Sequence, residues 1–366
     1  MKSRVMKILM FTIGSILILV LMVVFILWIK SPGKAQPITD ASGEVIEGSI
    51  STIEKITIGG LEQYVIIRGA STDKPVMLFL HGGPGSPEIA FMNHFNREIE
   101  NDFIMVYWEQ RGAGKSYSKE IPPETMTLEQ FILDAREMSE YLTKRFNQKK
   151  IFVMGHSWGS LMGILTAYRY PDLFHAYFGI GQVAKQLEAE KISLEWVKEQ
   201  ARDRNDEKAI KALSALTFPD VAASDSIWLD YLLEERKYVS EFGGSMRNIK
   251  GMWPIIKMLS NVKEYTLSEK MNYMQGSLFS LQYMWREVVE ADVPSMVDSM
   301  QIPVYIFQGV YDYQTPYSVA KDFYDSLKAP EKELFTFENS AHAPIMEEAE
   351  KFNSIVREKA ALFENQ

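Results

Sequence analysis

The residues that could do chemistry in this chain centre on the pentapeptide Gly155-His156-Ser157-Trp158-Gly159. It follows the apolar run 151–154 and precedes an apolar pattern of helical spacing over 161–168, so the sequence predicts a strand, a sharp turn and a helix. A turn this tight requires residues without bulky side chains two positions before and two after the serine, and glycine stands at both. We therefore expect Ser157 to stand out at the end of a strand as a nucleophile for acyl transfer.

A serine hydroxyl needs a base to remove its proton, and histidine is the common choice. Hydrolases that present serine on such a turn carry the acid and then the base further along the chain, after later strands of the same sheet. Asp312 follows the predicted strand 304–307, and His342 follows the predicted strand 334–337. Both are expected at the sheet edge where Ser157 emerges, with Asp312 orienting the imidazole of His342.

Two other carboxylates follow the strand that precedes Asp312. Asp322 and Asp325 lie within the pattern 316–327, which predicts a helix. Carboxylates on the solvated face of a helix are ordinary, so these two are weaker alternatives for the acid.

The tetrahedral intermediate of acyl transfer needs backbone N–H donors aimed at its oxyanion. One is expected from Trp158, the residue after the nucleophile. The second is expected from the loop His81-Gly82-Gly83-Pro84-Gly85-Ser86-Pro87, which follows the predicted strand 76–80. We select the N–H of Gly83, with Gly82 as the alternative. A phosphate-binding loop is the rival interpretation, but no Lys-Ser/Thr pair follows and Pro84 lacks an N–H.

The elements that must position these residues alternate between strands and helices. The predicted strands are 53–58, 61–67, 76–80, 103–107, 151–154, 176–180, 304–307 and 334–337. The first two are joined by Gly59-Gly60 and read as an antiparallel hairpin, and the short apolar runs read as strands buried on both faces. Helical spacing over 127–146 begins with Thr127 and Gln130 placed as a capping box. The sequence therefore predicts an α/β fold, a mostly parallel sheet with helices on both faces.

The alternation is interrupted over residues 183–295, which carry helical patterns and many large side chains but no strand pattern. An insertion of this kind between two strands predicts a helical cap over the active site. The predicted organisation is a membrane anchor at 1–34, a first core part at 35–182 with a linker at 35–48, the cap at 183–295, and a second core part at 296–366.

Residues 8–29 are apolar or small and carry no charge. At about 1.5 Å per residue, this run is long enough to cross a hydrocarbon core of ~30 Å as a transmembrane helix. A secretory signal peptide cleaved near Ala35 is the rival interpretation. Lys2, Arg4 and Lys7 precede the run and Lys30 and Lys34 follow it, which favours a signal anchor with a cytoplasmic N-terminus and the catalytic domain outside. The Pro- and Gly-containing segment 31–48 is expected to lift the domain off the bilayer.

Charge and composition exclude some functions. The net charge is −9, and because five basic residues precede the first acid, everything after Lys34 carries −14. An acidic body of this kind argues against nucleic-acid binding. The chain has no cysteine, which excludes disulfides, thiolate metal sites and a cysteine nucleophile.

Together these motifs resemble the proline iminopeptidase branch of the α/β-hydrolase superfamily, the S33-type serine peptidases. The resemblance rests on 81–85, on Gln110-Arg111-Gly112-Ala113-Gly114-Lys115-Ser116, on 155–159, and on the Asp312 and His342 loops, and it extends from about residue 53 to the C-terminus. It implies a helical cap, a Ser-Asp-His mechanism without metal or organic cofactor, and release of an N-terminal residue, often proline, from small peptides. Glu109 stands where the family usually has Asp, and His156 where it more often has Gly.

In that family the cap supplies acidic groups for the ammonium of the substrate. Glu234, Glu235 and Glu241 are the candidates for substrate binding here, with ordinary surface charge as the alternative. The sequence thus predicts a membrane-anchored aminopeptidase acting on small peptides. A carboxylesterase with the same triad is the first alternative, and a surface receptor that keeps the fold without the chemistry is the second. The sequence leaves the oligomeric state open.

Overall fold

Eight strands form one sheet in the order β1-β2-β4-β3-β5-β6-β7-β8 in the computed structural model, which describes residues 2–249 and 251–363. The strands are β1 (Ile50–Ile58), β2 (Leu61–Gly69), β3 (Val76–Leu80), β4 (Ile104–Glu109), β5 (Ile151–His156), β6 (Phe174–Ile180), β7 (Val304–Gly309) and β8 (Lys332–Phe337). β1 pairs antiparallel with β2, and β2 pairs antiparallel with β4. The remaining neighbours are parallel, which confirms the predicted hairpin and mostly parallel sheet.

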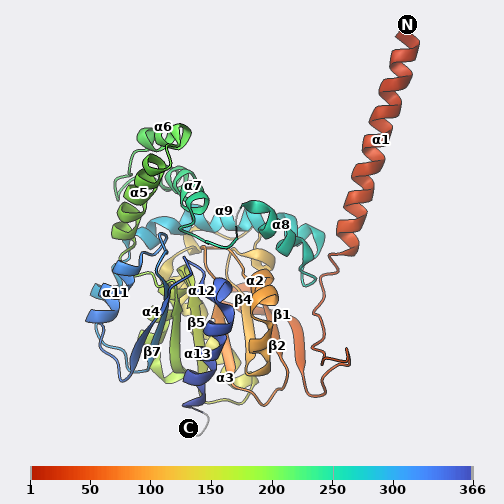
Figure 1. Cartoon of the computed structure of the whole chain (residues 1–366). Helices are drawn as coiled ribbons and strands as arrows, with labels where there is room; N and C mark the ends of the chain where they lie inside the picture. The colour runs from red at the N-terminus through yellow and green to blue at the C-terminus, as the bar shows by residue number, and fades with distance from the viewer. Residues whose placement is uncertain (1, 250, 364–366) are drawn as a thin grey trace.

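The central strands are apolar on both faces because helices cover both faces of the sheet (Figure 1). Along β3, Val76, Leu78 and Leu80 pack into one hydrophobic core, while Met77 and Phe79 pack into the other. This alternation follows from the two-residue period of a strand. A continuous apolar run is therefore what a strand between two helix layers requires.

The helices divide between the two cores. They are α1 (Lys2–Ile29), α2 (Ile89–Phe95), α3 (Leu128–Arg145), α4 (Trp158–Arg169), α5 (Gln186–Asp203), α6 (Glu207–Ala215), α7 (Asp225–Phe242), α8 (Met252–Asn261), α9 (Leu267–Glu290), α10 (Val293–Met296), α11 (Tyr317–Ser326), α12 (Pro344–Glu347) and α13 (Ala349–Ala361). Buried residues of α3, α4 and α11 join the first core, and those of α2 and α13 join the second. Helices α5 to α10 come between β6 and β7 in the chain, and α5 to α9 lie over one end of the sheet (Figure 1).

The start of α3 differs in one detail from the predicted capping box. Thr127 caps the helix, since its hydroxyl accepts a hydrogen bond from the Gln130 backbone N–H. The Gln130 side chain, however, donates to Asp134 Oδ1 at 2.7 Å. Asp134 also binds Arg111, so a buried ion pair uses the amide that a capping box would have used.

Helix α1 extends away from the domain as a single rod (Figure 1). Within the described residues it is the one helix long and apolar enough to cross a membrane, over Arg4–Ile29, and none of that stretch is buried. Met1 and residues 364–366, which the predicted anchor and second core part include, lie outside the described residues.

The segment after α1 was expected to be a spacer, and it is instead fastened to the body. Pro32 forms a β-bridge with Thr266, and the Lys34 N–H donates to the Lys263 carbonyl at 3.0 Å. The Gln36 carbonyl accepts from Arg68 Nη1 at 2.7 Å. The physical reason is that the cap and the hairpin offer partners for backbone groups that a free linker would leave to water.

Candidate active site

Ser157 lies on a sharp turn between β5 and α4, as the pentapeptide predicts. Its backbone has φ 55° and ψ −120°, a conformation that is strained for a residue with a side chain. A Cβ on Gly155 would collide with the backbone of Gly159, and a Cβ on Gly159 would collide with the Leu80 carbonyl. Both glycines are therefore required by close approach of backbone to backbone.

Asp312 and His342 are joined by a buried hydrogen bond. Asp312 follows β7 and His342 follows β8, and the His342 Nδ1 lies 2.8 Å from Asp312 Oδ2. Thr315 Oγ1 donates to the same oxygen at 2.7 Å, and Gln308 Nε2 donates to it at 2.9 Å. The backbone N–H groups of Gln314 and Thr315 both donate to Oδ1 at 2.8 Å. With this many donors the carboxylate is fixed in orientation and so fixes the imidazole.

The other imidazole nitrogen, His342 Nε2, is buried and forms no hydrogen bond with a described residue. The carbonyl of His342 lies 2.9 Å from His156 Nε2, while His156 Nδ1 lies 2.7 Å from Glu88 Oε1. Burial alone would lower the pKa of His156, but the Glu88 carboxylate outweighs it and raises that pKa. The His156–Glu88 pair thus holds the backbone of the His342 loop against the turn that carries Ser157.

Gly83 and Trp158, the predicted oxyanion donors, line one cavity with Ser157. Trp158 is the first residue of α4, where N–H groups have no partner within the helix. Gly83 has φ 115°, and a Cβ there would lie 2.6 Å from the Gly85 nitrogen. The alternative donor, Gly82, packs against Ser157, since a Cβ on it would lie 3.2 Å from the Ser157 Cβ.

The glycine-rich loop is held in place by a neutral histidine. His81 Nδ1 lies 2.8 Å from the Gly82 carbonyl, and the Gln110 N–H donates to His81 Nε2 at 3.3 Å. Burial lowers the pKa of His81 to about 4. Gln110 continues the link, because its Oε1 accepts from the Trp158 indole at 2.9 Å. The loop, the motif 110–116 and the serine turn thus form one connected unit.

The cavity beside Ser157 has a volume of about 230 Å³ and is roofed by α5, α7 and α9. Its wall is mostly apolar, with Leu232, Leu281, Trp285 and Val288 among the lining residues. Gln186 and Arg236 are its polar groups from the cap.

Arg236 belongs to a buried ionic cluster that the sequence did not reveal. Arg236 pairs with Glu190 and Glu235, and Ser193 donates to Glu235. Burial alone would lower the pKa of Arg236, but the two carboxylates outweigh it and raise that pKa. Burial raises the pKa of Glu235 despite the guanidinium.

Gln186 faces this cluster with a defined orientation. Its Nε2 donates to Glu190 Oε1 at 2.7 Å and to the Gln314 carbonyl at 3.0 Å. Its Oε1 is left buried and without a partner among the described residues. The i, i+4 spacing of Gln186 and Glu190 was the available signal, but Arg236 is brought to them only by packing of α7 on α5.

The three acids proposed for substrate binding do not line this cavity. Glu235 is buried in the ionic cluster, Glu234 pairs with the exposed Lys237, and Glu241 is exposed. Asp322 and Asp325, the alternative acids, lie in α11, where Asp325 pairs with Lys321. Within the described residues, no group of three His, Asp or Glu side chains is arranged to hold a metal ion.

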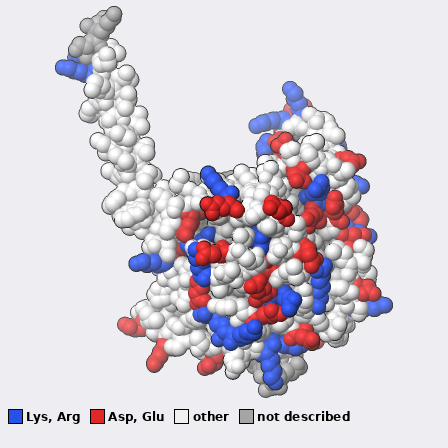
Figure 2. Space-filling view, turned by 180° about the vertical axis from the view of Figure 1, so that it is seen from behind, with Lys and Arg blue, Asp and Glu red and all other residues white. Residues whose placement is uncertain are grey.

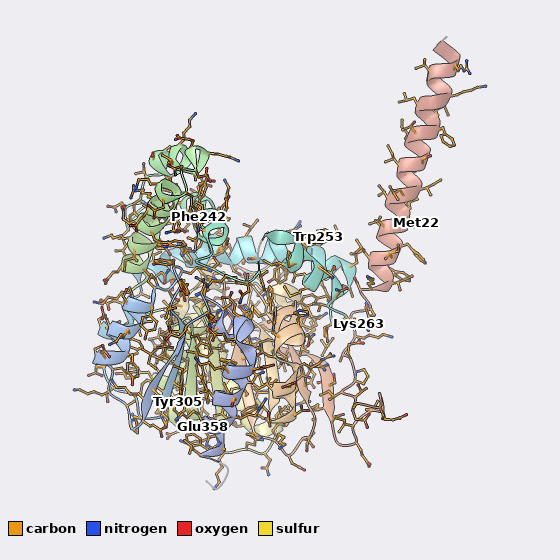
Figure 3. All side chains as sticks on the ribbon, viewed as in Figure 1. Met22, Phe242, Trp253, Lys263, Tyr305 and Glu358 are labelled. Carbon is orange, nitrogen blue, oxygen red and sulfur yellow. The ribbon has the colours of Figure 1, made fainter. Side chains whose placement is uncertain are left out.

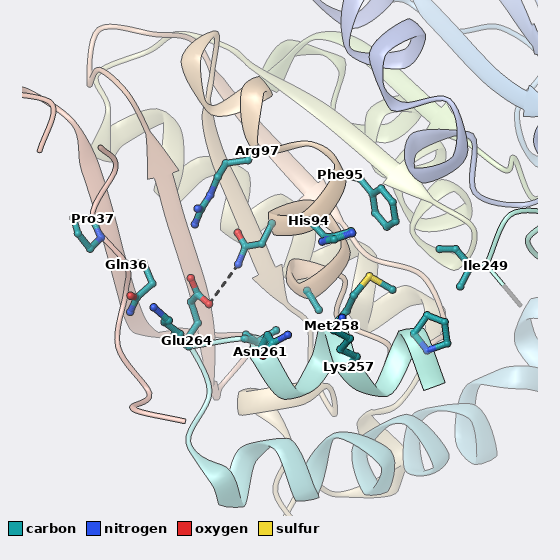
Figure 4. Close-up of a pocket in the computed structure, with 15 residues that line it drawn as sticks. Gln36, Pro37, His94, Phe95, Arg97, Ile249, Lys257, Met258, Asn261 and Glu264 are labelled. Carbon is teal, nitrogen blue, oxygen red and sulfur yellow. Dashed lines mark hydrogen bonds between the residues drawn. The ribbon is translucent and has the colours of Figure 1, made fainter. Parts of the chain in front are cut away.

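A larger cavity, of about 600 Å³, lies away from these residues between α2, α8 and the segment after α1 (Figure 4). None of the predicted site residues lines it.

The family of the alpha/beta hydrolase fold matches residues 75–349. This chain belongs to that family. It is similar to the probable aminopeptidase YbaC of Bacillus subtilis (strain 168), with 33% identity over 305 residues that cover 83% of this chain and 94% of the relative. It is also similar to a proline iminopeptidase of Lactobacillus crispatus, with 28% identity covering 86% of this chain and 97% of the relative.

Among solved structures, a proline iminopeptidase-related protein of Thermus thermophilus superposes with a TM-score of 0.60 at 16% identity, covering 85% of this chain and 98% of that one. At this identity the match shows the fold alone. The resemblance to proline iminopeptidases, expected from the motifs, is confirmed by the relatives in sequence.

Proposed function

We propose that this chain is a membrane-anchored serine hydrolase that releases N-terminal residues from small peptides through an acyl-enzyme on Ser157. The observation that carries the proposal is the buried Asp312–His342 hydrogen bond, which leaves His342 Nε2 without a partner close to the serine turn. Ser157 lines a small cavity together with Gly83 and Trp158. The relatives named as aminopeptidases support the peptide class of substrate.

In the proposed reaction Ser157 Oγ attacks the carbonyl carbon while His342 Nε2 takes the hydroxyl proton. Asp312 keeps Nδ1 protonated and stabilises the imidazolium. The N–H groups of Gly83 and Trp158 bind the oxyanion. His342 then returns the proton to the leaving amine as the C–N bond breaks. Water, deprotonated by His342, attacks the resulting ester, which releases the acid and restores Ser157.

The ammonium group of the substrate would bind at Gln186. Its Oε1 is a buried acceptor without a partner among the described residues, and the residue lines the cavity. Its Nε2 donates to Glu190 Oε1 and to the Gln314 carbonyl, which fixes the amide so that the oxygen remains available to accept from an ammonium. Replacing Gln186 with Leu is expected to raise KM for an aminoacyl arylamide more than for an acyl ester, which lacks the ammonium.

The test is turnover of unblocked aminoacyl arylamides, proline among them, by the detergent-solubilised full chain. We expect cleavage that is lost in Ser157→Ala and weakened when the amino group of the substrate is acylated. Failure to cleave any unblocked arylamide while short acyl esters turn over would remove the peptidase assignment.

A carboxylesterase is the second candidate, because the cavity wall is mostly apolar and its one cationic group, Arg236, is already paired. The same panel separates the two. Esters turned over with equal efficiency whether or not they carry an amino group would favour the esterase.

Anchoring by α1 is supported by its length, its apolar surface and the basic residues near its N-terminal end. We place its N-terminus in the cytoplasm and the domain outside. Added protease should degrade the domain in intact cells. Full protection of the domain until the cells are lysed would overturn this topology.

A further inference from the structure

Helices α8 and α9 expose large apolar side chains to solvent. Trp253 and Ile256 lie one turn apart on α8, and Trp253 is 74% exposed. Met271, Met274 and Leu278 follow the spacing of one face of α9, and Met271 is 69% exposed. We call these five residues the α8–α9 face.

The opposite side of α9 already packs onto the body. Tyr273, Ser277 and Ser280 are buried there, and the Tyr273 hydroxyl donates to the Pro87 carbonyl at 3.0 Å. The apolar side chains of the α8–α9 face are therefore not needed for the protein's own core. Exposed apolar patches of this kind mark interaction sites.

The end of α1 is tied directly to this face. Pro32 bridges to Thr266, the N-cap of α9, only three residues after α1 ends. Lys270 Nζ donates to the Lys30 carbonyl at 3.4 Å and to the Ser260 carbonyl at 2.8 Å, which links α1, α8 and α9. Trp28 and Ile29 of α1 line a surface cavity of about 710 Å³ together with Met271. A bilayer that contains α1 must therefore begin beside the α8–α9 face.

The views of the whole molecule agree with this placement. Figure 3 places Trp253 and Lys263 on the side of the domain from which α1 extends, and Glu358 at the opposite end. Figure 2 shows the uncharged surface of α1 continuing onto the adjoining edge of the domain. Helices α5 to α7 project toward the same side (Figure 1), so α1 must tilt for the face to reach the lipid. Tilts of about 20°, and up to roughly 40°, are usual for transmembrane helices.

The charges around the face complement an anionic lipid surface. Lys257, Lys263 and Lys270 lie on it or beside it, and the first two form no ion pair with a described residue. Of the two carboxylates between residues 251 and 278, Glu264 is 1% exposed and Glu269 pairs with Lys115. The rest of the body is acidic, so this surface is a local exception. Lysines beside an apolar face that enters the bilayer interface are attracted to anionic lipid headgroups.

The cavity of about 600 Å³ between α2 and α8 adds to this basic surface. It opens beneath α8, and its lining includes Arg97, Lys257 and Lys263 (Figure 4). Lipid headgroups that carry a negative charge would meet cations both on α8 and under it.

We propose that the α8–α9 face lies in the headgroup and acyl-chain boundary of the bilayer, so that the domain is held against the membrane surface and does not stand off on a linker. The inference rests on the proposed anchoring by α1. It commits to lipid as the occupant because the face is continuous with a helix of transmembrane length and carries lysines without an ion-pair partner among the described residues.

The absence of cysteine from the chain makes a direct test possible. Trp253→Cys and Met271→Cys are made as separate single-cysteine variants of the full chain and labelled with a nitroxide. Each labelled protein is reconstituted in nanodiscs of phosphatidylcholine and phosphatidylglycerol. Phe11→Cys, within α1, serves as the lipid reference, and Leu362→Cys, exposed at the far end of the domain, serves as the water reference. Each label's collision rate is measured with oxygen, which concentrates in lipid, and with a water-soluble nickel chelate.

We expect the oxygen-to-nickel ratio at positions 253 and 271 to be shifted from the value at 362 toward the value at 11. A ratio equal to that at 362, while position 11 reports lipid, would overturn this inference and leave the anchor intact. A water-like ratio at position 11 would overturn the anchor and the inference together. Low collision rates with both reagents at 253 and 271 would show that a second copy or another protein covers the face, which also contradicts the proposal.

Discussion

Glu109 gives the protein a predicted pH dependence of stability. The side chain is buried at the end of β4, where its Oε2 accepts the Lys115 N–H at 2.5 Å and its Oε1 has no partner among the described residues. Burial raises the pKa of Glu109 from the ordinary 4.5 to about 7. The folded state therefore binds the proton more tightly than the unfolded state, and stability falls as the pH rises from about 4.5 to about 7.

The difference between these two pKa values corresponds to roughly 3 kcal/mol, because one pKa unit is worth about 1.4 kcal/mol. For a domain of roughly 330 residues, unfolding entropy of about 2.1 cal/mol/K per residue converts this to about 4 °C in Tm. Glu109→Gln cannot ionise, so its Tm should lie close to that of the wild type at pH 5 and about 4 °C above it at pH 8.

The assay is thermal unfolding of the detergent-solubilised full chain, followed by tryptophan fluorescence at several pH values. Glu120→Gln, which removes an exposed carboxylate of the same kind, is the matched control and should follow the wild type throughout. If Glu109→Gln and the wild type show parallel Tm profiles between pH 5 and pH 8, the assignment of a raised pKa to this buried carboxyl is wrong.

Three further changes test the site and its supports. Gly159→Ala should prevent folding or lower Tm by several degrees, because its Cβ collides with the Leu80 carbonyl. Gly14→Ala is the control, since its Cβ meets no atom within 4 Å, and equal expression and Tm for the two variants would refute the close approach at Gly159. Arg236→Leu leaves two buried carboxylates without their cation and should lower the free energy of unfolding by about 3–5 kcal/mol, measured by denaturant unfolding. A decrease of less than about 1 kcal/mol would contradict this. Asp312→Asn should lower kcat by about 10³–10⁴ with little change in Tm, and a kcat near that of the wild type would exclude Asp312 as the orienting acid.

The core of the fold could be predicted because its signals are local. The predicted strand 76–80 coincides with β3, because five consecutive apolar residues suit a strand that is buried on both faces between two helix layers. Gly59-Gly60 sets the β1–β2 hairpin for a similarly local reason, since both glycines have positive φ. The position of the segment 31–48 could not be predicted, because its partners, Thr266 and Lys263, are distant in the sequence.

The same contrast holds for the site. Ser157, Asp312 and His342 were selected by their positions after strands, and strand ends of a parallel sheet meet at one edge. No comparable rule relates the position of a residue in the cap sequence to the cavity. Glu235, a predicted substrate-binding acid, is paired with Arg236, whereas Gln186, which lines the cavity, carries no sequence signal of that position. Which side chains of α5 and α7 face the cavity depends on how the helices pack.

We propose above all that Ser157 is a nucleophile activated by His342. Labelling of the full chain with a fluorophosphonate probe, followed by mass spectrometry of the labelled peptide, tests this role of Ser157. We expect one adduct, on Ser157, that is absent from Ser157→Ala. A wild type that does not label, or a Ser157→Ala variant that labels equally, would contradict it.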